Sequence, residues 1–287
     1  MNDEEPSRTA LMAAAGRAAH LLVDREPFIF EDTVAHALLG DGAEELIGYH
    51  RAYGDHLILS GVRAQVTIRS HYAERRLTEL AGLGVTQYVI LGAGLDTFAH
   101  RSPLTGQVAV FEVDHPATQR WKRGLLAEAG ITPPEALAFV GVDFETDALV
   151  DRLVACGFDP AKPALVSWLG VSMYLTDQAV VATLAEIGRL APGTELIMEY
   201  ALSPVLRDEK GEAYAQMAMA AAAERGEPWL SLFAPEELSA KLADHHLDVA
   251  EHVREQEAVD PALWRRHDAL QCADACRLVR AVVRTRP

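Results

Sequence analysis

The sequence is poor in cysteine and contains no long apolar run. Its 287 residues include three cysteines, Cys156, Cys272 and Cys276, whose odd number and spacing fit neither a disulfide framework nor a zinc motif. Reduced thiols and no metal site are therefore expected. No apolar run reaches the ~20 residues that span a bilayer. The acidic start MNDEEPSR lacks the apolar core of a signal peptide, so we expect a cytoplasmic protein without a membrane partner.

Cationic residues are also scarce. The chain has 26 lysines and arginines against 42 acids, which gives a formal net charge of −16. Such a surface repels nucleic-acid phosphates, so we expect no nucleic-acid partner. The apolar fraction of 49% and the charged fraction of 24% are those of an ordinary globular protein that buries a large core. A small-molecule partner is the expectation that remains.

One stretch, from Gly84 to Pro116, predicts the ligand site. An apolar, β-branched run over 85–91 has the length of a strand, and Gly92-Ala93-Gly94 follows it. Glycine lets the backbone turn sharply and lets a ligand approach it closely. The sequence therefore predicts a strand that ends in a ligand-binding turn.

The next predicted strand, 108–113, ends in two acids. Glu112 and Asp114 alternate onto the same face of that strand. In an open α/β sheet, ligands bind at the carboxyl ends of the strands, so the glycine turn and an acid should meet at one edge. This arrangement predicts a nucleoside site, with the backbone against the ligand and a carboxylate on the ribose hydroxyls.

The glycine turn departs from the dinucleotide fingerprint. G-x-G-x-x-G/A requires a small third residue, whereas this chain has Thr97, preceded by Asp96. An acid there would repel a pyrophosphate at the helix N-terminus. S-adenosylmethionine (SAM) has no phosphate and carries a cationic amino group, so it is favoured as the cofactor. Two alternatives stay open: an NAD(P)-dependent oxidoreductase on a similar sheet, and a non-catalytic module that binds SAM.

The hydrophobic pattern predicts an α/β fold behind a helical N-terminal region. Residues 9–82 look helical, including segments 44–60 and 62–80. We expect an N-terminal helical cap over 1–82 and a core over 83–287, with a helical insertion at about 205–243, all in one compact unit. Strands that alternate with helices indicate a parallel sheet covered on both faces. They are predicted at 85–91, 108–113, 137–141, 164–168, 194–200, 247–253 and 276–284, with a short helix at 260–270.

Two motifs carry a family resemblance. LGAGLDT (91–97) and FEVDHP (111–116), with a lone Arg101 between them and Lys122 downstream, resemble the leucine carboxyl methyltransferase family. The chain is most similar to its bacterial branch, which O-methylates polyketides and other natural products. The resemblance spans roughly residues 9–200. It implies a class I SAM-dependent methyltransferase, with a Rossmann-like seven-stranded sheet whose last strand is antiparallel and an inserted lid helix.

The resemblance also implies which residues hold the cofactor. By the family's pattern, Asp114 binds the ribose and Arg69 clamps the methionine carboxylate. Asp143 and Phe144 lie where the family has an acid and an apolar residue, which contact the adenine. The turn Gly92-Ala93-Gly94 completes this set.

Some positions differ from the family's pattern. Leu169 stands where the family usually has an acid, and Phe98 replaces a common Arg. Both changes make the expected pocket more apolar. Arg101 and Lys122 are interpreted as structural charges that tie loops together.

Four side chains are predicted on the substrate side. Tyr72, Tyr174 and Tyr200 fall near the predicted strand ends, and Met217 lies in a predicted helix, 208–225, rich in Ala and Met. Methionine adapts to irregular apolar shapes, so a bulky, partly apolar natural product is the expected acceptor.

The expected reaction is O-methylation. A carboxylate is already ionised at pH 7 and needs no base, whereas a hydroxyl acceptor usually requires one. The sequence shows no nucleophile elbow and no obligatory acid–base pair. A carboxylate is therefore slightly favoured over a hydroxyl as the acceptor.

Overall fold

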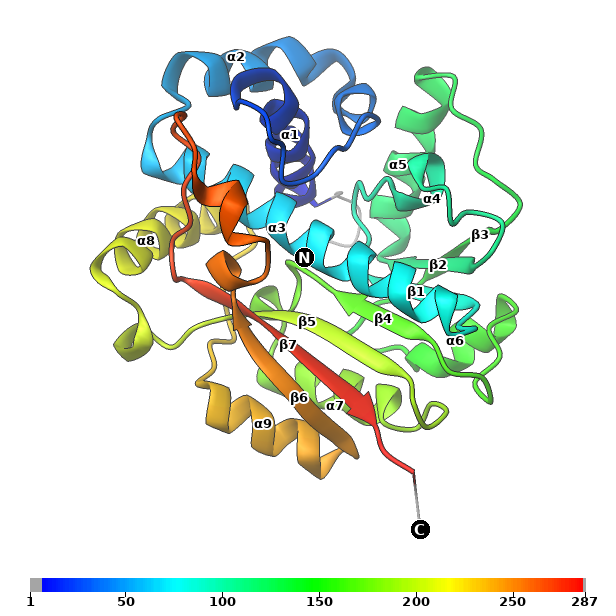
Figure 1. Ribbon diagram of the computed structural model, residues 1–287. Helices are drawn as coiled ribbons and strands as arrows, with labels where there is room; N and C mark the ends of the chain where they lie inside the picture. The colour runs from blue at the N-terminus through cyan, green and yellow to red at the C-terminus, as the bar shows by residue number, and fades with distance from the viewer. Residues whose placement is uncertain (1–6, 286–287) are drawn as a thin grey trace.

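Seven strands form one mixed sheet in the computed structural model, which describes residues 7–285 (Figure 1). The strand order is β3-β2-β1-β4-β5-β7-β6, and β7 is antiparallel to both of its neighbours. The predicted seven-stranded sheet with an antiparallel last strand is confirmed. The strands are β1 (Gln87–Leu91), β2 (Ala109–Asp114), β3 (Leu137–Gly141), β4 (Leu165–Trp168), β5 (Glu195–Ala201), β6 (Leu247–Arg254) and β7 (Cys276–Val283).

Helices cover both faces of the sheet and surround its carboxyl edge. None of the helices in residues 7–285 combines the length and the hydropathy of a membrane span. The α-helices are α1 (Arg8–Val23), α2 (Ala43–Tyr53), α3 (Leu57–Gly82), α4 (Phe98–Arg101), α5 (Pro116–Glu128), α6 (Leu149–Ala155), α7 (Asp177–Ile187), α8 (Glu209–Ala223) and α9 (Pro235–Asp244). Short 3₁₀ turns are η1 (Ala35–Gly42), η2 (Ser172–Tyr174), η3 (Pro204–Leu206), η4 (Glu255–Glu257) and η5 (Pro261–Trp264).

The alternation of side chains in β1 divides the core into two layers. Tyr88 and Ile90 point to the face that α3 covers, where Ile68 and Leu77 of α3 belong to the same buried cluster. Figure 1 shows α3 running across this face in front of β1 and β4. Val89 points to the opposite face, where α6, α7 and α9 pack. Burial on both faces explains why the strands are almost continuously apolar.

The structure corrects two expectations from the sequence. Helix α3 continues through Gly61, whereas the sequence pattern placed a break there, between segments 44–60 and 62–80. Gly61 is a packing site, because a Cβ atom there would lie 2.7 Å from the ring of Tyr214 in α8. In addition, residues 260–270 form only the 3₁₀ turn η5 rather than a helix of that length.

The N-terminal elements form a third buried cluster. Ala14 and Ala18 of α1 pack with Leu38 of η1, Ile47 of α2 and Leu126 of α5. In Figure 1 these elements lie above the sheet, and α8 lies to its left. A cap that ends at residue 82 remains a proposal, because α3 contributes to the core of the sheet while α1, η1 and α2 pack on one another.

Candidate functional site

The carboxyl ends of the central strands are aligned in register. Leu91, the last residue of β1, pairs with Val113 of β2 and with Trp168 at the end of β4. Asp114 pairs with Gly141 at the end of β3. The segments that follow these strands therefore meet at one edge, which brings together the glycine turn, Asp114, the loop of Asp143 and the loop of Gly170.

The glycine turn is closely surrounded. Gly92 has φ +64° and Gly94 has φ +49°, a backbone region that L-residues with a side chain rarely adopt. A Cβ atom at Gly92 would lie 2.2 Å from a methyl carbon of Val171, and one at Gly94 would lie 2.9 Å from the Cβ of Ala10. Ala93, between them, is buried. Both glycines are required by conformation and by space.

We expect Gly92→Ala to destabilise the protein and to weaken SAM binding. The positive φ costs about 1–2 kcal/mol, and the contact with Val171 adds roughly 1–3 kcal/mol of overpacking. Gly130→Ala is the matched control, because Gly130 has a similar φ of +68° and nothing within 4 Å of the added Cβ atom. Urea unfolding measures the free energy of unfolding of both variants. Equal losses of stability in Gly92→Ala and Gly130→Ala would show that the space around Gly92 is not restricted.

Asp114 holds the glycine turn through its carboxylate. Its Oδ2 accepts a hydrogen bond from the Gly94 N–H at 2.5 Å, and its Oδ1 accepts one from the His115 N–H at 2.7 Å. Burial raises the pKa of this carboxyl group, and the two backbone donors oppose that shift. Each carboxylate oxygen keeps a second lone pair for a ribose hydroxyl. Asp114 is therefore suited both to shape the loop and to bind the ligand.

Glu112 takes a different role from Asp114. Its Oε2 lies 2.5 Å from the Nζ of Lys122, and both side chains are 1% exposed. Arg101 likewise pairs with Glu74 and donates to Thr97. These ion pairs are what the interpretation of Lys122 and Arg101 as structural charges predicts.

Asp143 and Phe144 follow β3 at the same edge. Asp143 Oδ1 accepts a hydrogen bond from the Glu145 N–H at 3.0 Å, so the acid stabilises its own loop. The ring of Phe144 stacks on Trp168 at the end of β4, with a centroid distance of 6.4 Å and an interplanar angle of 29°. The loop therefore carries an aromatic ring and an acid at this edge, and their contact with an adenine ring remains a proposal.

Arg69 reaches the same edge from α3. Its Nη1 donates to Glu199 Oε2 at 2.6 Å, and the guanidinium lies so close to Gly170 that a Cβ atom there would be 2.4 Å from Nη1. A guanidinium has five N–H donors, so the bond to Glu199 leaves donors for a ligand carboxylate. Glu199 is completely buried and fixes the position of Arg69.

A buried network behind Arg69 was not predicted from the sequence. Gln65 donates from Nε2 to Glu199 Oε1 at 2.9 Å, and Tyr214 donates to Gln65 Oε1 at 2.6 Å. The network links α3, β5 and α8. The one available signal was Glu199 itself, an acid inside the apolar run 195–201, because a buried charge in a strand requires a partner.

We expect loss of Arg69 to weaken SAM binding by roughly 10- to 100-fold, since a hydrogen bond to a charged group contributes about 1.5–3 kcal/mol. Arg69→Ala alone leaves Glu199 buried and unpaired, so the informative variant is Arg69→Ala/Glu199→Gln. Arg75→Ala, which removes an exposed arginine from the same helix, is the control. Calorimetry measures the SAM affinity of all three variants. Wild-type affinity in the double variant would remove Arg69 from the site.

The structure separates the predicted substrate residues. Burial raises the pKa of the Tyr174 hydroxyl to about 12, and the nearby positive charge of Arg69 opposes this shift. Tyr72 instead contacts β6, where its hydroxyl donates to Glu251 Oε1 at 2.7 Å. Tyr200 points to the α9 face, fully buried, with its hydroxyl 2.8 Å from His252 Nδ1. Met217 is half-buried on α8. Tyr72 and Tyr200 therefore have structural partners away from Arg69.

The start of α1 forms a strap over the glycine turn. The Ser7 N–H donates to Thr118 Oγ1 at 3.4 Å, and the Thr9 N–H donates to Glu227 Oε2 at 2.9 Å. One of these anchors lies on α5 and the other in the loop after α8, and Ala10, the residue after Thr9, lies against Gly94. These contacts hold the start of α1 beside the glycine turn.

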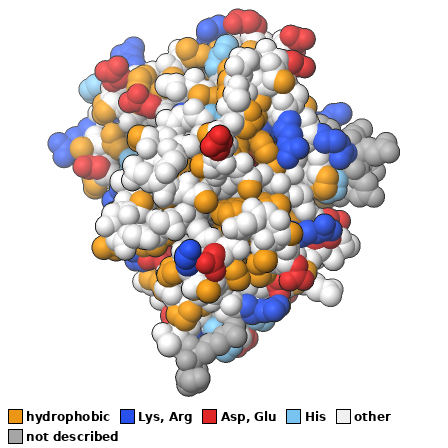
Figure 2. Space-filling model, turned by 90° about the vertical axis from the view of Figure 1, so that its right-hand side faces the viewer, with side chains coloured by type: hydrophobic (Ala, Val, Ile, Leu, Met, Phe, Trp, Pro, Cys, Tyr) orange, Lys and Arg blue, Asp and Glu red, His pale blue; other side chains and the backbone are white. Residues whose placement is uncertain are grey.

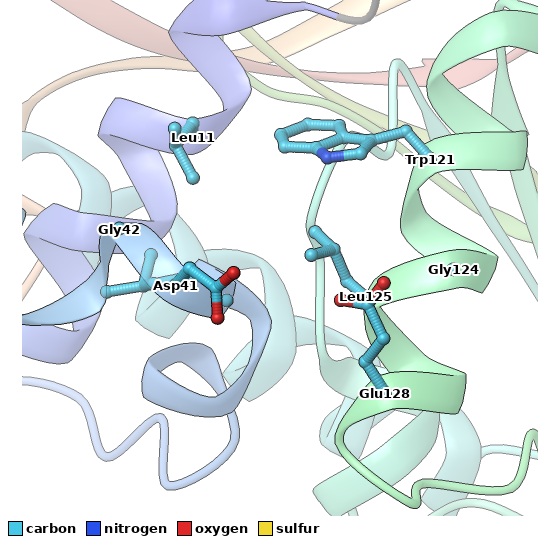
Figure 3. Close-up of a pocket in the computed structure, with 9 residues that line it drawn as sticks. Leu11, Asp41, Gly42, Trp121, Gly124, Leu125 and Glu128 are labelled. Atoms are coloured by element: carbon cyan, nitrogen blue, oxygen red, sulfur yellow. The ribbon is translucent and has the colours of Figure 1, made fainter.

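A cavity of about 430 Å³ lies between α1, η1 and α5. Figure 3 shows Leu11 of α1 facing Trp121 of α5 across it, with Asp41 and Leu125 below. None of its lining residues was predicted to bind the cofactor.

The fold and the edge define a class of protein. A seven-stranded sheet with one reversed strand, a glycine turn bonded to an acid and an arginine at the same edge is the arrangement of class I SAM-dependent methyltransferases. The leucine carboxyl methyltransferase family matches residues 10–188, and the chain belongs to this family. Membership makes SAM the cofactor and the protein an enzyme, so the oxidoreductase and non-catalytic alternatives are dropped.

Sequence relatives carry the same assignment, and solved structures share the fold. YktD of Bacillus subtilis, whose name assigns it to the SAM-dependent methyltransferases, is 32% identical over 98% of this chain and 99% of its own length. A relative from Mycolicibacterium smegmatis with the same assignment is 34% identical over 71% of this chain and 70% of its own. A methyltransferase structure from Thermobifida fusca (19% identity, TM-score 0.60, covering 98% of this chain and 96% of that one) shares the fold. A DUF574 family protein from Streptomyces avermitilis (17% identity, TM-score 0.62, covering 98% of each chain) shares the fold as well.

Proposed function

We propose that this enzyme transfers the methyl group of SAM to an oxygen atom of a small, partly apolar natural product such as a polyketide, with a carboxylate favoured over a hydroxyl. The observation that carries the proposal is the convergence of Asp114, the glycine turn and Arg69 at one edge. When bound, SAM supplies an electrophilic methyl group. An acid for the ribose and an arginine for the methionine carboxylate fit its two polar ends.

The protein's own part in such a transfer is positioning. Holding two reactants in line can supply roughly 7–11 kcal/mol of the barrier, so no catalytic base is required for an acceptor that is already ionised. Glu199 holds Arg69, and Asp114 holds the glycine turn, which together fix where the methyl donor lies. A carboxylate acceptor gives an ester and releases no proton.

The acceptor side of the proposed pocket is largely apolar. Leu169, which stands where the family usually has an acid, is partly buried against the cluster that contains Phe98, whereas Phe98 itself is buried edge-on against Tyr88 and belongs to the core. Tyr174 packs beside Trp229, in a cluster between η2 and the segment after α8. These surfaces support an acceptor with hydrophobic bulk, with Met217 as a further proposed contact.

The outer surface supports a small-molecule acceptor rather than a nucleic acid. On the face turned to the viewer in Figure 2, basic side chains stand in small separate groups among acidic and hydrophobic ones. The net charge of −16 adds a general repulsion of polyanions. A cytoplasmic location and the absence of a membrane partner remain part of the proposal.

Methyl transfer from labelled SAM to a panel of aromatic and polyketide acids and phenols tests the proposal. We expect label in an organic-soluble product that mild base releases as methanol, which identifies an ester. A base-stable ether would instead identify a hydroxyl acceptor. Arg69→Ala/Glu199→Gln and heat-treated enzyme are the controls. Label that appears on nitrogen or carbon would overturn O-methylation.

A further inference from the structure

Three ionisable side chains from distant parts of the sequence meet at the carboxyl edge, behind Arg69. Glu199 lies near the end of β5, Glu255 directly follows β6, and Cys276 is the first residue of β7. One carboxylate oxygen of each glutamate and the Cys276 Sγ lie within 4.8 Å of one another. Because β7 runs antiparallel to β5 and β6, all three positions come to the same edge of the sheet.

Glu255 has no protein partner for one of its oxygens. Its side chain is 4% exposed, and Oε1 is inaccessible to solvent and makes no hydrogen bond within residues 7–285. Glu199 and Cys276 are also buried, at 0% and 1% exposure. An unpaired buried carboxylate oxygen costs several kcal/mol unless a proton or a cation satisfies it. The Glu255 carboxylate lies within reach of two further ligand atoms, which favours a shared cation.

Charge balance indicates the valence of that cation. A bound metal would displace the protons of these groups, so that two carboxylates and one thiolate would carry three negative charges, and Arg69, which is bonded to Glu199, supplies one positive charge. A divalent cation would neutralise the remaining two. The bonds from Arg69 and Gln65 occupy one lone pair on each oxygen of Glu199, and each oxygen has a second lone pair for a metal.

We propose that Glu199, Glu255 and Cys276 form a binding site for a divalent cation of the zinc type. Thiolate ligands select Zn²⁺ or Co²⁺ over Mg²⁺ and Ca²⁺, whereas the two carboxylates accept either class. Three protein ligands leave a fourth position for water in a tetrahedral site. The sequence did not indicate this site, because its three ligands do not form a short spacing motif. The proposal is independent of the methyl acceptor.

Cobalt substitution tests the site without any knowledge of the substrate. Tag-free protein is analysed for bound metal by mass spectrometry as isolated, then treated with chelator and titrated with Co²⁺. We expect one equivalent to bind, with a thiolate-to-cobalt charge-transfer band in the near ultraviolet and tetrahedral bands in the visible. Zn²⁺ should abolish these bands by displacement, and excess Mg²⁺ should not.

Three variants locate the ligands. Cys276→Ser should abolish the charge-transfer band, and Cys276→Ser and Glu255→Gln should each weaken binding at least about tenfold, since even residues outside the ligand shell affect metal affinity by 10- to 100-fold. Cys272→Ser, which removes a half-buried thiol outside the cluster, should leave the spectrum unchanged. Circular dichroism confirms folding. If Cys276→Ser does not fold, the metal affinity of Glu255→Gln alone tests the site. No stoichiometric binding by wild type, or equal binding by Glu255→Gln, would overturn the site.

Discussion

Asp114→Ala is expected to weaken SAM binding by roughly 100-fold while the protein stays folded. Two hydrogen bonds from a ribose diol to a buried carboxylate contribute about 3 kcal/mol, and each 1.4 kcal/mol changes affinity tenfold. The variant also removes the bonds that Asp114 accepts from the N–H groups of Gly94 and His115. The glycine turn therefore loses its support together with the ribose contact. Calorimetry with SAM and with S-adenosylhomocysteine measures the effect.

Asp159→Ala is the matched control for Asp114→Ala. Asp159 also accepts a backbone hydrogen bond, from the Ala161 N–H at 3.0 Å, but it precedes β4 and so lies at the opposite edge of the sheet. Its loss should leave SAM affinity unchanged. Because burial raises the pKa of Asp114, wild-type affinity should begin to fall with acidification at a higher pH than an ordinary aspartate would produce. Wild-type affinity in Asp114→Ala would contradict the proposed ribose contact.

Most of the sheet was predictable because its strands carry a strong local signal. Each predicted strand lies within two residues of the observed strand at either end, and β3 agrees at both ends. Runs of apolar, β-branched residues bounded by glycine or proline are short and unambiguous. The position of Asp114 against the glycine turn followed from the rule that parallel strands end at the same edge.

The parts that the sequence did not predict depend on contacts between distant residues. Gly61 suggests a helix break locally, but its missing side chain is what lets Tyr214 pack against α3. Tyr72 lies within α3, where its hydroxyl contacts Glu251 of β6. Tyr200 falls near a strand end in the sequence, yet neighbouring residues of a strand point to opposite faces. Tyr200 thus lies under α9 while Glu199 faces Arg69. No local pattern distinguishes a pocket residue from a core residue in such a strand.

Lys122→Met is expected to lower the free energy of unfolding by about 1–2 kcal/mol at pH 8, because it leaves the buried Glu112 carboxyl group without its partner and makes it retain a proton. Methionine keeps the apolar stem of the lysine, so the loss reports mainly on charge. Lys162→Met is the control, since Lys162 forms an exposed pair with Asp159 and such pairs contribute about 0–1 kcal/mol. Urea unfolding measures both variants. A loss in Lys122→Met no larger than in Lys162→Met would contradict the prediction.

The loss caused by Lys122→Met should also depend on pH. Burial raises the pKa of Glu112 from 4.5 to about 7, and Lys122 opposes this shift. A group with a raised folded-state pKa binds a proton more tightly when folded, so its contribution to stability falls as pH rises from 4.5 to about 7 and is constant above that. Without Lys122 the pKa rises further, and the decline extends to higher pH. Near pH 5, Glu112 is protonated in both proteins, so the difference between them should be smaller than at pH 8 by about 1.4 kcal/mol. A difference that stays constant from pH 5 to pH 8 would show that packing, and not the charge of Glu112, determines the loss.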